Sequence, residues 1–344
     1  CLSDQKEEFE YNGARCFKVE VPNIGPAKAV YYDIAALKEV YAYVVENNIE
    51  DAIVYILACR IGPFLKKYVR LFHEKNIKVF VNPDGHEFKR AKWNWFIRKY
   101  WKLSERLMIK NADYVICDSQ NIESYIQKDY KKYKPQTTYI AYGADIVDNN
   151  DEEKFTNWSK EHNVQKNEYY LIVGRFVPEN NYETMIKEFM SSNTKKDLII
   201  VTDYQNNKLY HNLDNKYHFT SDARIKFVGT IYDDSLLKSV RMNAFAYLHG
   251  HEVGGTNPSL LEALGSTKLN LLLNVGFNQE VGIDTCIYWG KEKGNLKKLI
   301  EHVETFDQDY IDTLGKEAKN RILEAYSWKL IVSKYEDFFL RKDL

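Results

Sequence analysis

The chain has 344 residues, of which 44% are hydrophobic and 28% charged, and its formal net charge at pH 7 is −1. No apolar run approaches the roughly 20 residues that a membrane-spanning helix needs, which excludes a helical membrane protein and predicts a soluble, globular protein of two domains. The five cysteines include no Cys-x-x-Cys pair, which favours a reducing cytoplasm over a disulfide scaffold.

The N-terminal half alternates apolar, β-branched runs with amphipathic helical patterns. Strands are expected at 14–22, 51–58, 77–85, 112–119 and 137–143. Helices are expected at 29–48, after Gly62-Pro63, at 91–111, and from Ser119 or Asn121. This alternation is typical of parallel βαβ units.

A polar, strand-free segment at 145–166 separates this series from a second one. There, strands are expected at 168–176, 197–203, 224–230, 244–250 and 269–275, and helices from Asp233 or Asp234 and from Asn257. The sequence therefore predicts an α/β protein with two doubly wound, Rossmann-like domains, residues 1–150 and 151–325, followed by a C-terminal segment, 326–344. Ligands of such sheets bind beyond the carboxyl ends of the strands.

The loop "NPDGHEFKR", residues 82–90, follows a strand of the first domain. It brings together four polar side chains, those of Asp84, His86, Glu87 and Arg90. This grouping at a strand end favours a functional role. The alternative for His86 is a structural histidine that is hydrogen-bonded within its loop.

The next stretch, 89–110, interleaves aromatic and basic side chains, and the wider region 60–110 holds 14 Lys or Arg residues against four acidic ones. The residues in question include Arg90, Lys92, Trp93, Trp95 and Arg98. Such a composition suits docking on an anionic lipid surface. Basic-aromatic segments also bind nucleic acid, and a third possibility is a helix with a core-facing aromatic stripe and a solvated basic face.

In the second domain, Gly174 and Arg175 directly follow a buried strand. An arginine at this point can place its fork of N–H donors on a diphosphate. The alternative is a solvated surface arginine. A second loop of the same sheet is also suited to an anion, and this favours the diphosphate interpretation of Arg175.

That second loop is "HGHEVGGTNPSLLEALG", residues 249–265. Asn257 is a good N-cap and Pro258 a good first helical residue, so the amides of Gly255, Thr256 and Asn257 are expected to be open to an anion. Gly254 and Gly255 would let the anion approach the backbone. An ordinary tight turn is the alternative.

Two metal sites are also conceivable. His249, His251 and Glu252 are residue types that bind zinc, but nothing else in the chain supplies a matching ligand set. Asp307 and Asp309 have the DxD spacing that holds a metal-bound donor in some enzymes, but they lie at an expected helix start, where acids act as caps. We therefore predict no metal site.

Several motifs resemble the retaining GT-B glycosyltransferases of the GT4 group: "VGRFVPEN", "FVGTIYDDSLLKSV", "GGTNPSLLEALG", "YSWKLIVSKYEDFF", "ADYVICDSQNIESYI" and "TTYIAYGAD". More narrowly, "VPNIGPAKAVYYDIAALK", "NPDGHEFKRAKWNW" and "HGHEVGGTNPSLLEAL" resemble bacterial β-1,4-rhamnosyltransferases. Those enzymes use dTDP-rhamnose in capsule or cell-wall polysaccharide synthesis. The resemblance spans essentially the whole chain.

The resemblance implies the GT-B fold, in which two Rossmann-like domains face each other across a cleft and a C-terminal helix packs back toward the N-terminal domain. It also implies that the first strand-loop-helix unit of the N-terminal domain is missing here. Donor contacts implied by the resemblance are Arg175 on the diphosphate, Gly255, Thr256 and Asn257 on the distal phosphate and sugar, Glu262 on the ribose, and Thr230 and Ile231 on the base. A salt bridge is the alternative role for Glu262.

Two positions depart from the GT4 pattern. Asn180 stands where the group usually has a lysine, and Gly254 where it usually has a glutamate. Arg175 or a residue of the N-terminal domain is expected to replace the positive charge of the absent lysine in donor binding. Glu252 is the acid nearest in sequence to Gly254, where the glutamate is absent. Both Asn180 and Gly254 stay in the expected donor site.

By the same resemblance His86 lies near the transferred sugar, and Asp84 and Glu87 are expected to orient the acceptor. The leaving diphosphate helps to deprotonate the acceptor while Arg175 stabilises its charge. No cofactor or obligatory metal is needed beyond the nucleotide-sugar. The expected partners are a lipid-linked glycan and the inner face of the plasma membrane, without nucleic acid. A non-catalytic sugar- or nucleotide-binding protein of the same fold is the main alternative to this enzyme, and a nucleic-acid-binding protein is a weaker one.

Overall fold

The computed structural model describes residues 8–22, 24–90, 93–146 and 151–341. The chain divides into two compact units, one of Cys1–Lys89 with Trp93–Tyr139 and one of Ile140–Leu344 with Arg90–Lys92. Residues 326–341, which we separated from the second domain on sequence grounds, are grouped with the second unit. No helix within the described ranges is long and apolar enough to cross a bilayer.

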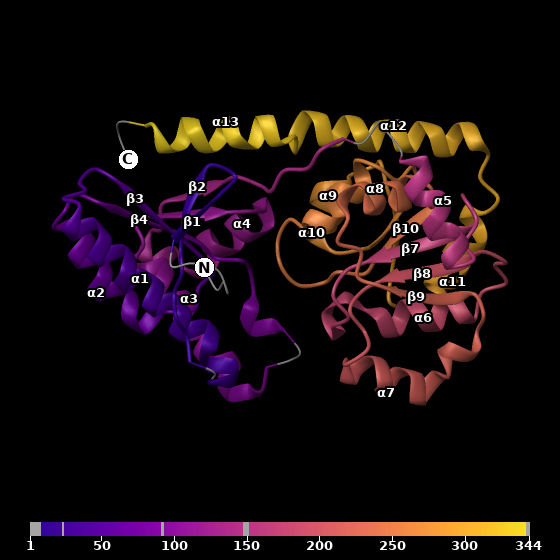
Figure 1. The fold of residues 1–344 in the computed structure, drawn as a ribbon, viewed down its shortest axis with the longest axis horizontal. Helices are drawn as coiled ribbons and strands as arrows, with labels where there is room; N and C mark the ends of the chain where they lie inside the picture. The colour runs from indigo at the N-terminus through magenta and orange to yellow at the C-terminus, as the bar shows by residue number, and fades with distance from the viewer. Residues whose placement is uncertain (1–7, 23, 91–92, 147–150, 342–344) are drawn as a thin grey trace. The chain divides into compact units, whose positions relative to one another are not determined.

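The N-terminal unit is built on a four-stranded parallel sheet in the order β3-β4-β5-β6. Figure 1 labels β3 and β4 of this sheet. Its strands are β3 (Ile53–Leu57), β4 (Lys78–Asn82), β5 (Tyr114–Cys117) and β6 (Thr137–Tyr139). Its helices are α1 (Lys28–Glu46), α2 (Gly62–His73), α3 (Trp95–Asn111) and α4 (Gln120–Asp129). The predicted alternation of strand and helix is confirmed, and Ser119 is the N-cap of α4.

One N-terminal prediction was incomplete. The strand expected at 14–22 is β2 (Ala14–Phe17), which pairs antiparallel with β1 (Glu8–Tyr11) in a sheet of its own. The two-residue turn between them is Asn12-Gly13, with φ of 48° and 77°. Asn-Gly is the preferred dipeptide for such a turn because both central residues need positive φ. The Asn12-Gly13 dipeptide therefore indicates the hairpin, although the alternation of strands and helices does not.

The C-terminal unit contains a six-stranded parallel sheet in the order β12-β11-β10-β7-β8-β9. Its strands are β7 (Tyr169–Val173), β8 (Asp197–Val201), β9 (Ile225–Gly229), β10 (Ala246–His249), β11 (Asn270–Leu273) and β12 (Ile287–Trp289). Its helices are α5 (Glu152–Glu161), α6 (Tyr182–Met190), α7 (Lys208–Tyr217), α8 (Asp234–Met242), α9 (Pro258–Leu264), α10 (Gly276–Gly282), α11 (Asn295–Val303), α12 (Gln308–Ala325) and α13 (Trp328–Phe339). This strand order is that of a Rossmann sheet, whose direction of winding reverses between β7 and β10.

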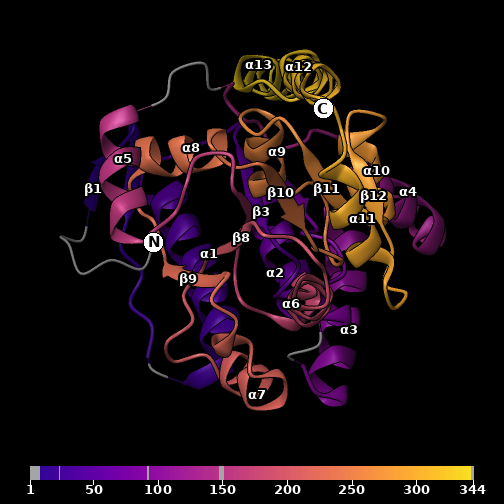
Figure 2. The same ribbon diagram turned by 90° about the vertical axis from the view of Figure 1, so that its right-hand side faces the viewer.

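Both faces of this sheet are buried. Tyr170 and Ile172 of β7 belong to the core on one face, and Tyr169 and Leu171 to the core on the other. The alternation follows from the two-residue period of a strand. Figures 1 and 2 show α6 on one side of the sheet and α8 and α9 on the opposite side. The loops after β7 and β10 therefore lead to helices on different faces.

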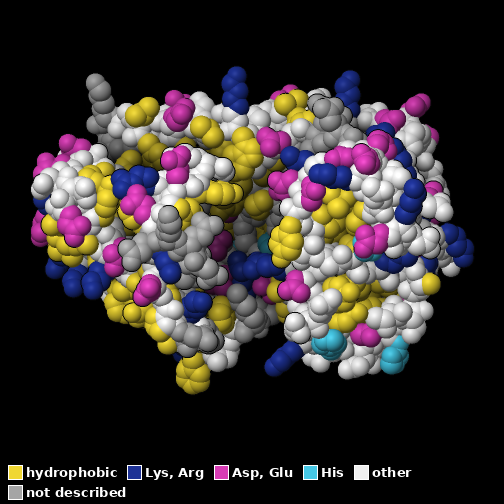
Figure 3. All heavy atoms as spheres, in the orientation of Figure 1, with side chains coloured by type: hydrophobic (Ala, Val, Ile, Leu, Met, Phe, Trp, Pro, Cys, Tyr) yellow, Lys and Arg dark blue, Asp and Glu magenta, His cyan; other side chains and the backbone are white. Residues whose placement is uncertain are grey.

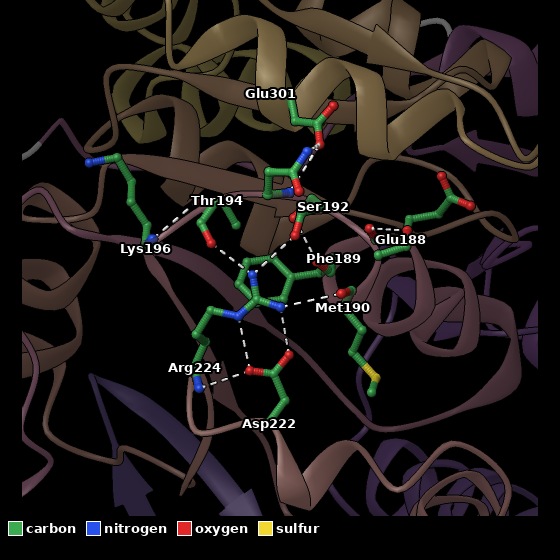
Figure 4. Close-up of polar contacts among 11 residues, drawn as sticks. Glu188, Phe189, Met190, Ser192, Thr194, Lys196, Asp222, Arg224 and Glu301 are labelled. Carbon is green, nitrogen blue, oxygen red and sulfur yellow. Dashed lines mark hydrogen bonds and ion pairs between the residues drawn. The ribbon is translucent and has the colours of Figure 1, made fainter.

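Arg224 anchors the end of α6 to the start of β9 (Figure 4). Its guanidinium donates hydrogen bonds to three carbonyl oxygens, those of Met190, Ser192 and Thr194. It also pairs with Asp222 at 2.6 Å. One side chain thus satisfies carbonyl groups that the end of a helix leaves without partners.

We predict that Arg224→Ala lowers the free energy of unfolding by about 2–3 kcal/mol, because hydrogen bonds from a charged donor are lost and their acceptors stay half-buried. Urea denaturation measures this change. The matched control is Lys166→Ala, which breaks the pair with Glu152, whose side chains are 53% and 64% exposed. The control is expected to change stability by less than about 0.5 kcal/mol. Equal losses in both variants would contradict the assignment.

Candidate functional site

A pocket of about 300 Å³ lies at the carboxyl ends of β7 and β10, the point where the sheet reverses its winding. Its polar lining comes from four segments: the loop after β7, the start of α6, the end of β10 with the loop that follows, and the first turn of α9. The polar side chains of this lining are those of Arg175, Asn180, Tyr182, Tyr247, His249, His251, Asn257 and Ser259. No Asp or Glu is among the described residues that line it.

Hydrogen bonds join the loop after β7 to the loop after β10. The amide of Glu252 donates to the carbonyl of Glu179 at 3.0 Å, and the Asn181 amide side chain donates to the carbonyl of Gly250 at 2.8 Å. At Gly250 the two backbones touch, since a Cβ there would lie 2.4 Å from the carbonyl oxygen of Asn180. These contacts fix the pocket wall, and they leave no room for a side chain at position 250.

Both polar atoms of the Asn180 side chain are used within the protein. Its Nδ2 donates to the carbonyl of Arg175 at 2.8 Å, and its Oδ1 lies 2.7 Å from Nδ1 of His251. Asn180 thus shapes the pocket by holding Arg175 and His251 in place. Direct contact between Asn180 and a donor stays a prediction.

Arg175 is exposed and lines the pocket. Within the described part of the chain its guanidinium forms no ion pair and no hydrogen bond. A cation left without a protein partner at the rim of a pocket without carboxylates is suited to an anionic ligand.

The first turn of α9 is built as the sequence predicts. Asn257 is the N-cap, and its Oδ1 accepts hydrogen bonds from the amides of Ser259 and Leu260 at 2.9 and 3.3 Å. The amides of Gly255 and Asn257 donate no hydrogen bond to the described residues. Gly255 and Thr256 are buried, and of these three residues Asn257 alone is among the described residues that line the pocket. Because α9 has only seven residues, its dipole adds little, and anion contacts here would come from single amides.

The two histidines of the pocket are neutral at pH 7. Burial lowers the pKa of His249 well below its usual value, and burial together with the nearby Arg175 lowers the pKa of His251 to about 4. Only 5% of His249 is exposed, and its Nε2 has no hydrogen-bond partner. Sequence analysis considered His249 only as a possible metal ligand. A histidine that ends a buried strand next to the glycine-rich loop was the available signal.

The possible metal site of His249, His251 and Glu252 does not form. The carboxylate of Glu252 pairs with Lys291 at 2.5 Å and accepts from Asn181 at 3.2 Å. Burial would raise the pKa of Glu252, but these hydrogen bonds outweigh it and lower the pKa. No group of three potential metal ligands occurs in the described ranges. Asp307 caps α12 by accepting from the amide of Tyr310, as predicted.

Glu262, expected on the ribose, forms the salt bridge that we gave as its alternative. Its carboxylate lies 2.6 Å from the guanidinium of Arg241, whose side chain is 4% exposed against 48% for Glu262. About half of the Glu262 side chain thus stays accessible, and ribose binding remains a prediction. Thr230 is exposed, and Ile231 is half-buried against the core.

In the N-terminal unit, the loop after β4 holds Asp84, Gly85 and His86 in left-handed conformations, with φ of 53°, 59° and 58°. Asp84 and His86 are not glycine, so a positive φ strains their backbone. Strained residues of this kind are concentrated at functional sites. The amide of Asp84 donates to Oδ1 of Asn82 at 2.8 Å. Glu87 accepts a hydrogen bond from Nε1 of Trp93 at 2.9 Å, so its carboxylate already has a protein partner.

The ring centroids of His86 and Tyr125 lie 4.2 Å apart. Nδ1 of His86 is buried and has no hydrogen-bond partner among the described residues. Burial and the nearby cations Lys89 and Lys102 lower the pKa of His86 to about 4. Tyr125 in turn donates to Glu105, which is 3% exposed and also contacts Lys102. Sequence analysis missed this cluster. Glu105 falls on the buried side of α3, four residues after Trp101, which could have indicated it.

The basic-aromatic stretch divides between core and surface. Trp101 is buried, while Trp95 and Phe96 are 59% and 76% exposed. Arg98 is exposed, and Nζ of Lys99 lies 3.7 Å from the centre of the Trp95 ring. Arg90 is partly buried, and Lys92 lies outside the described residues. Figure 3 shows dark-blue basic side chains beside yellow hydrophobic ones on the N-terminal unit.

Comparison with known proteins gives three kinds of match. Residues 1–145 match a family model described as a domain of unknown function, DUF1972. A Methanocaldococcus jannaschii protein named uncharacterized glycosyltransferase MJ1069 is 28% identical over 301 residues, which cover 81% of this chain and 69% of that protein. Sucrose-phosphate synthase from Thermosynechococcus elongatus matches in structure with a TM-score of 0.78 and 17% identity, over 98% of this chain and 85% of that one.

Anabaena Alr3699/HepE, solved in complex with UDP, matches with a TM-score of 0.67 and 14% identity, over 94% of this chain and 86% of that one. These structural likenesses, together with the parallel sheet in each unit, show that the chain has the GT-B fold. The predicted fold class is confirmed.

We predict that His251 makes folding depend on pH. Its pKa is 6.5 in ordinary surroundings and about 4 in the folded chain, so the unfolded chain takes up the proton first as pH falls. The stabilisation from a neutral His251 is full above pH 6.5 and is lost progressively toward pH 4. We expect a loss of about 2 kcal/mol between pH 7 and pH 5 from this residue. Urea denaturation across this range should show a shallower loss for His251→Gln, and identical slopes would refute the prediction.

Proposed function

We propose that this chain is a glycosyltransferase that takes its sugar from a nucleotide-sugar. The observation that carries the proposal is the unpaired guanidinium of Arg175 on a pocket without carboxylates, at the point of the sheet where Rossmann-type proteins bind nucleotides. The relative that is named a glycosyltransferase and the structural neighbour solved with UDP support it.

The pocket also favours one mechanism. Because none of the described residues lining it is an acid, it offers no carboxylate to act as nucleophile or as general base. The leaving diphosphate would itself accept the proton of the acceptor hydroxyl, and Arg175 would stabilise the negative charge that develops on it. This chemistry gives transfer with retention. In the N-terminal unit, we propose that His86 lies near the transferred sugar and that Asp84 and Glu87 orient the acceptor. Glu87 would do so while it accepts the hydrogen bond from Trp93.

For the donor we propose dTDP-L-rhamnose, and for the acceptor a lipid-linked glycan of bacterial surface polysaccharide. The motifs shared with β-1,4-rhamnosyltransferases support this choice, most directly "HGHEVGGTNPSLLEAL" and "NPDGHEFKRAKWNW". Thr230 and Ile231 would contact the base, Glu262 the ribose, and Gly254, Gly255 and Asn257 the distal phosphate and the sugar.

Nucleotide binding tests the pocket directly. In a calorimetric titration we expect dTDP to bind the chain more tightly than UDP or GDP, and Arg175→Ala to weaken dTDP binding by about 10- to 100-fold through loss of a charged hydrogen-bond donor. Lys195→Ala is the control, because this exposed lysine lies outside the pocket. Unchanged affinity in Arg175→Ala would remove the proposed site.

Turnover separates the enzyme from the alternative, a non-catalytic binding protein of the same fold. With dTDP-rhamnose and a lipid-linked acceptor, the enzyme releases dTDP in amounts that grow with time and forms a longer glycan. Binding of dTDP-rhamnose without product from any acceptor tried would favour the binding protein.

We further propose that the chain works at the inner face of the plasma membrane, docked through α3. Two exposed aromatic side chains, Trp95 and Phe96, stand beside the cations Arg98 and Lys99, a combination that suits an anionic lipid surface. The exposure of Trp95 and Phe96 favours this role over an aromatic stripe that only faces the core.

We predict that the double variant Trp95→Ala/Phe96→Ala binds vesicles of anionic and zwitterionic phospholipid about tenfold or more weakly than the unaltered chain, since exposed apolar area drives insertion. Co-sedimentation measures this binding. Leu323→Ala, which removes a side chain 54% exposed on α12, should leave binding unchanged. Wild-type binding that a single-stranded DNA competitor abolishes would point instead to nucleic acid.

A further inference from the structure

We propose that His249 binds the diphosphate of the donor directly, by donating a hydrogen bond from Nε2 to a phosphate oxygen. This inference rests on the proposed function, because it assigns a diphosphate to the pocket. It adds a binding residue that neither the motifs nor the comparisons indicate.

The first support is an unmet hydrogen bond. His249 is 5% exposed, and its Nε2 is buried with no hydrogen-bond partner. Leaving such a group unpaired costs folding free energy, so each case calls for an explanation. Since His249 lines the pocket, a ligand that displaces the atoms covering Nε2 can supply the acceptor that the described residues do not.

The second support is position. His249 is the last residue of β10, and the neighbouring strand β7 ends in the loop that carries Arg175. Ser259 in the first turn of α9 lines the same pocket. A diphosphate in this pocket would therefore lie among residues that the pocket brings together, Arg175, His249 and Ser259.

The third support is a set of contacts that holds the imidazole ring. Tyr247 lies two residues earlier on the same face of β10, with its ring 5.8 Å from that of His249 and nearly parallel to it. Its hydroxyl lies 3.5 Å from Nδ1 of His249 and 3.1 Å from Oγ of Ser259. Ser259 can donate its own proton to the carbonyl of Val173, at 3.2 Å. The Tyr247 hydroxyl has two acceptors within reach, the carbonyl of Val173 at 3.3 Å and Nδ1 of His249 at 3.5 Å. The proposal requires that it donate to Nδ1, which leaves the imidazole proton on Nε2.

The charge state suits the role as well. Burial lowers the pKa of His249 well below its usual value, so the ring offers an N–H donor without a positive charge. A neutral donor costs less to bury than a lysine would in the same place. Arg175 supplies the charge of the site, and His249 supplies a donor deeper in the pocket.

The test uses two substitutions that separate hydrogen bonding from packing. His249→Phe keeps the flat ring and removes the donor, whereas His249→Gln removes the ring and can place its amide N–H near the position of Nε2. If His249 binds phosphate, His249→Phe weakens dTDP and pyrophosphate binding by about tenfold or more and His249→Gln by less than about threefold. Thymidine, which carries no phosphate, should bind all three proteins equally. The opposite ranking, or equal affinities, would overturn the proposal.

A measurement on the unaltered chain does not depend on whether the variants fold. In a ¹⁵N NMR spectrum with labelled histidine, we expect the His249 ring to carry its proton on Nε2, and the Nε2 resonance to shift when pyrophosphate is added. A ring that is protonated on Nδ1, or an Nε2 signal that pyrophosphate leaves unmoved, would overturn the proposal. If neither dTDP nor pyrophosphate binds the wild-type chain, the proposed function itself fails. If both bind and only the His249 effects are missing, the proposed function stands without this inference.

Discussion

The pocket depends on the hydrogen bonds that join the loop after β7 to the loop after β10. Those loops lead to α6 and α9, which lie on opposite faces of the sheet, so the strands alone do not hold them together (Figures 1 and 2). The bonds from Glu252 to Glu179 and from Asn181 to Gly250 do. They use backbone groups and one asparagine, which leaves the guanidinium of Arg175 to a ligand. A site fixed in this way needs little rearrangement on binding.

The two departures from the GT4 pattern meet at one residue, His251. Asn180 stands in place of a lysine and lies 2.7 Å from Nδ1 of His251. Gly254 stands in place of a glutamate and has a φ of 134°, a conformation that other residues rarely adopt, and a Cβ there would lie 3.3 Å from Nε2 of His251. A lysine has no acceptor for a ring N–H, and a glutamate would crowd the ring. Asn180 and Gly254 together therefore accommodate the half-buried imidazole of His251.

The sequence predicted most strands, though not β1 or β12, because their signals are local: buried β-branched runs, and caps such as Ser119, Asp233 and Asn257 for the helices. It also indicated which loops carry the site, since parallel strands end at one edge of a sheet. It did not predict which side chains pair. Glu262 with Arg241 and Glu87 with Trp93 are contacts between side chains whose directions no periodic pattern encodes. The free Nε2 of His249 is likewise visible only once its neighbours are placed.

The charges of the pocket bear on product release in the proposed reaction. When the sugar leaves, the nucleoside diphosphate gains negative charge, so a site rich in fixed cations would bind the product more tightly than the donor. Among the described residues that line the pocket, Arg175 is the one Lys or Arg, and the two histidines beside it are neutral. Neutral N–H donors stabilise the developing charge with less attraction for the departing anion than lysines would exert. Asn180 acts in the same direction, because it holds Arg175 and His251 through hydrogen bonds without adding a charge to the wall.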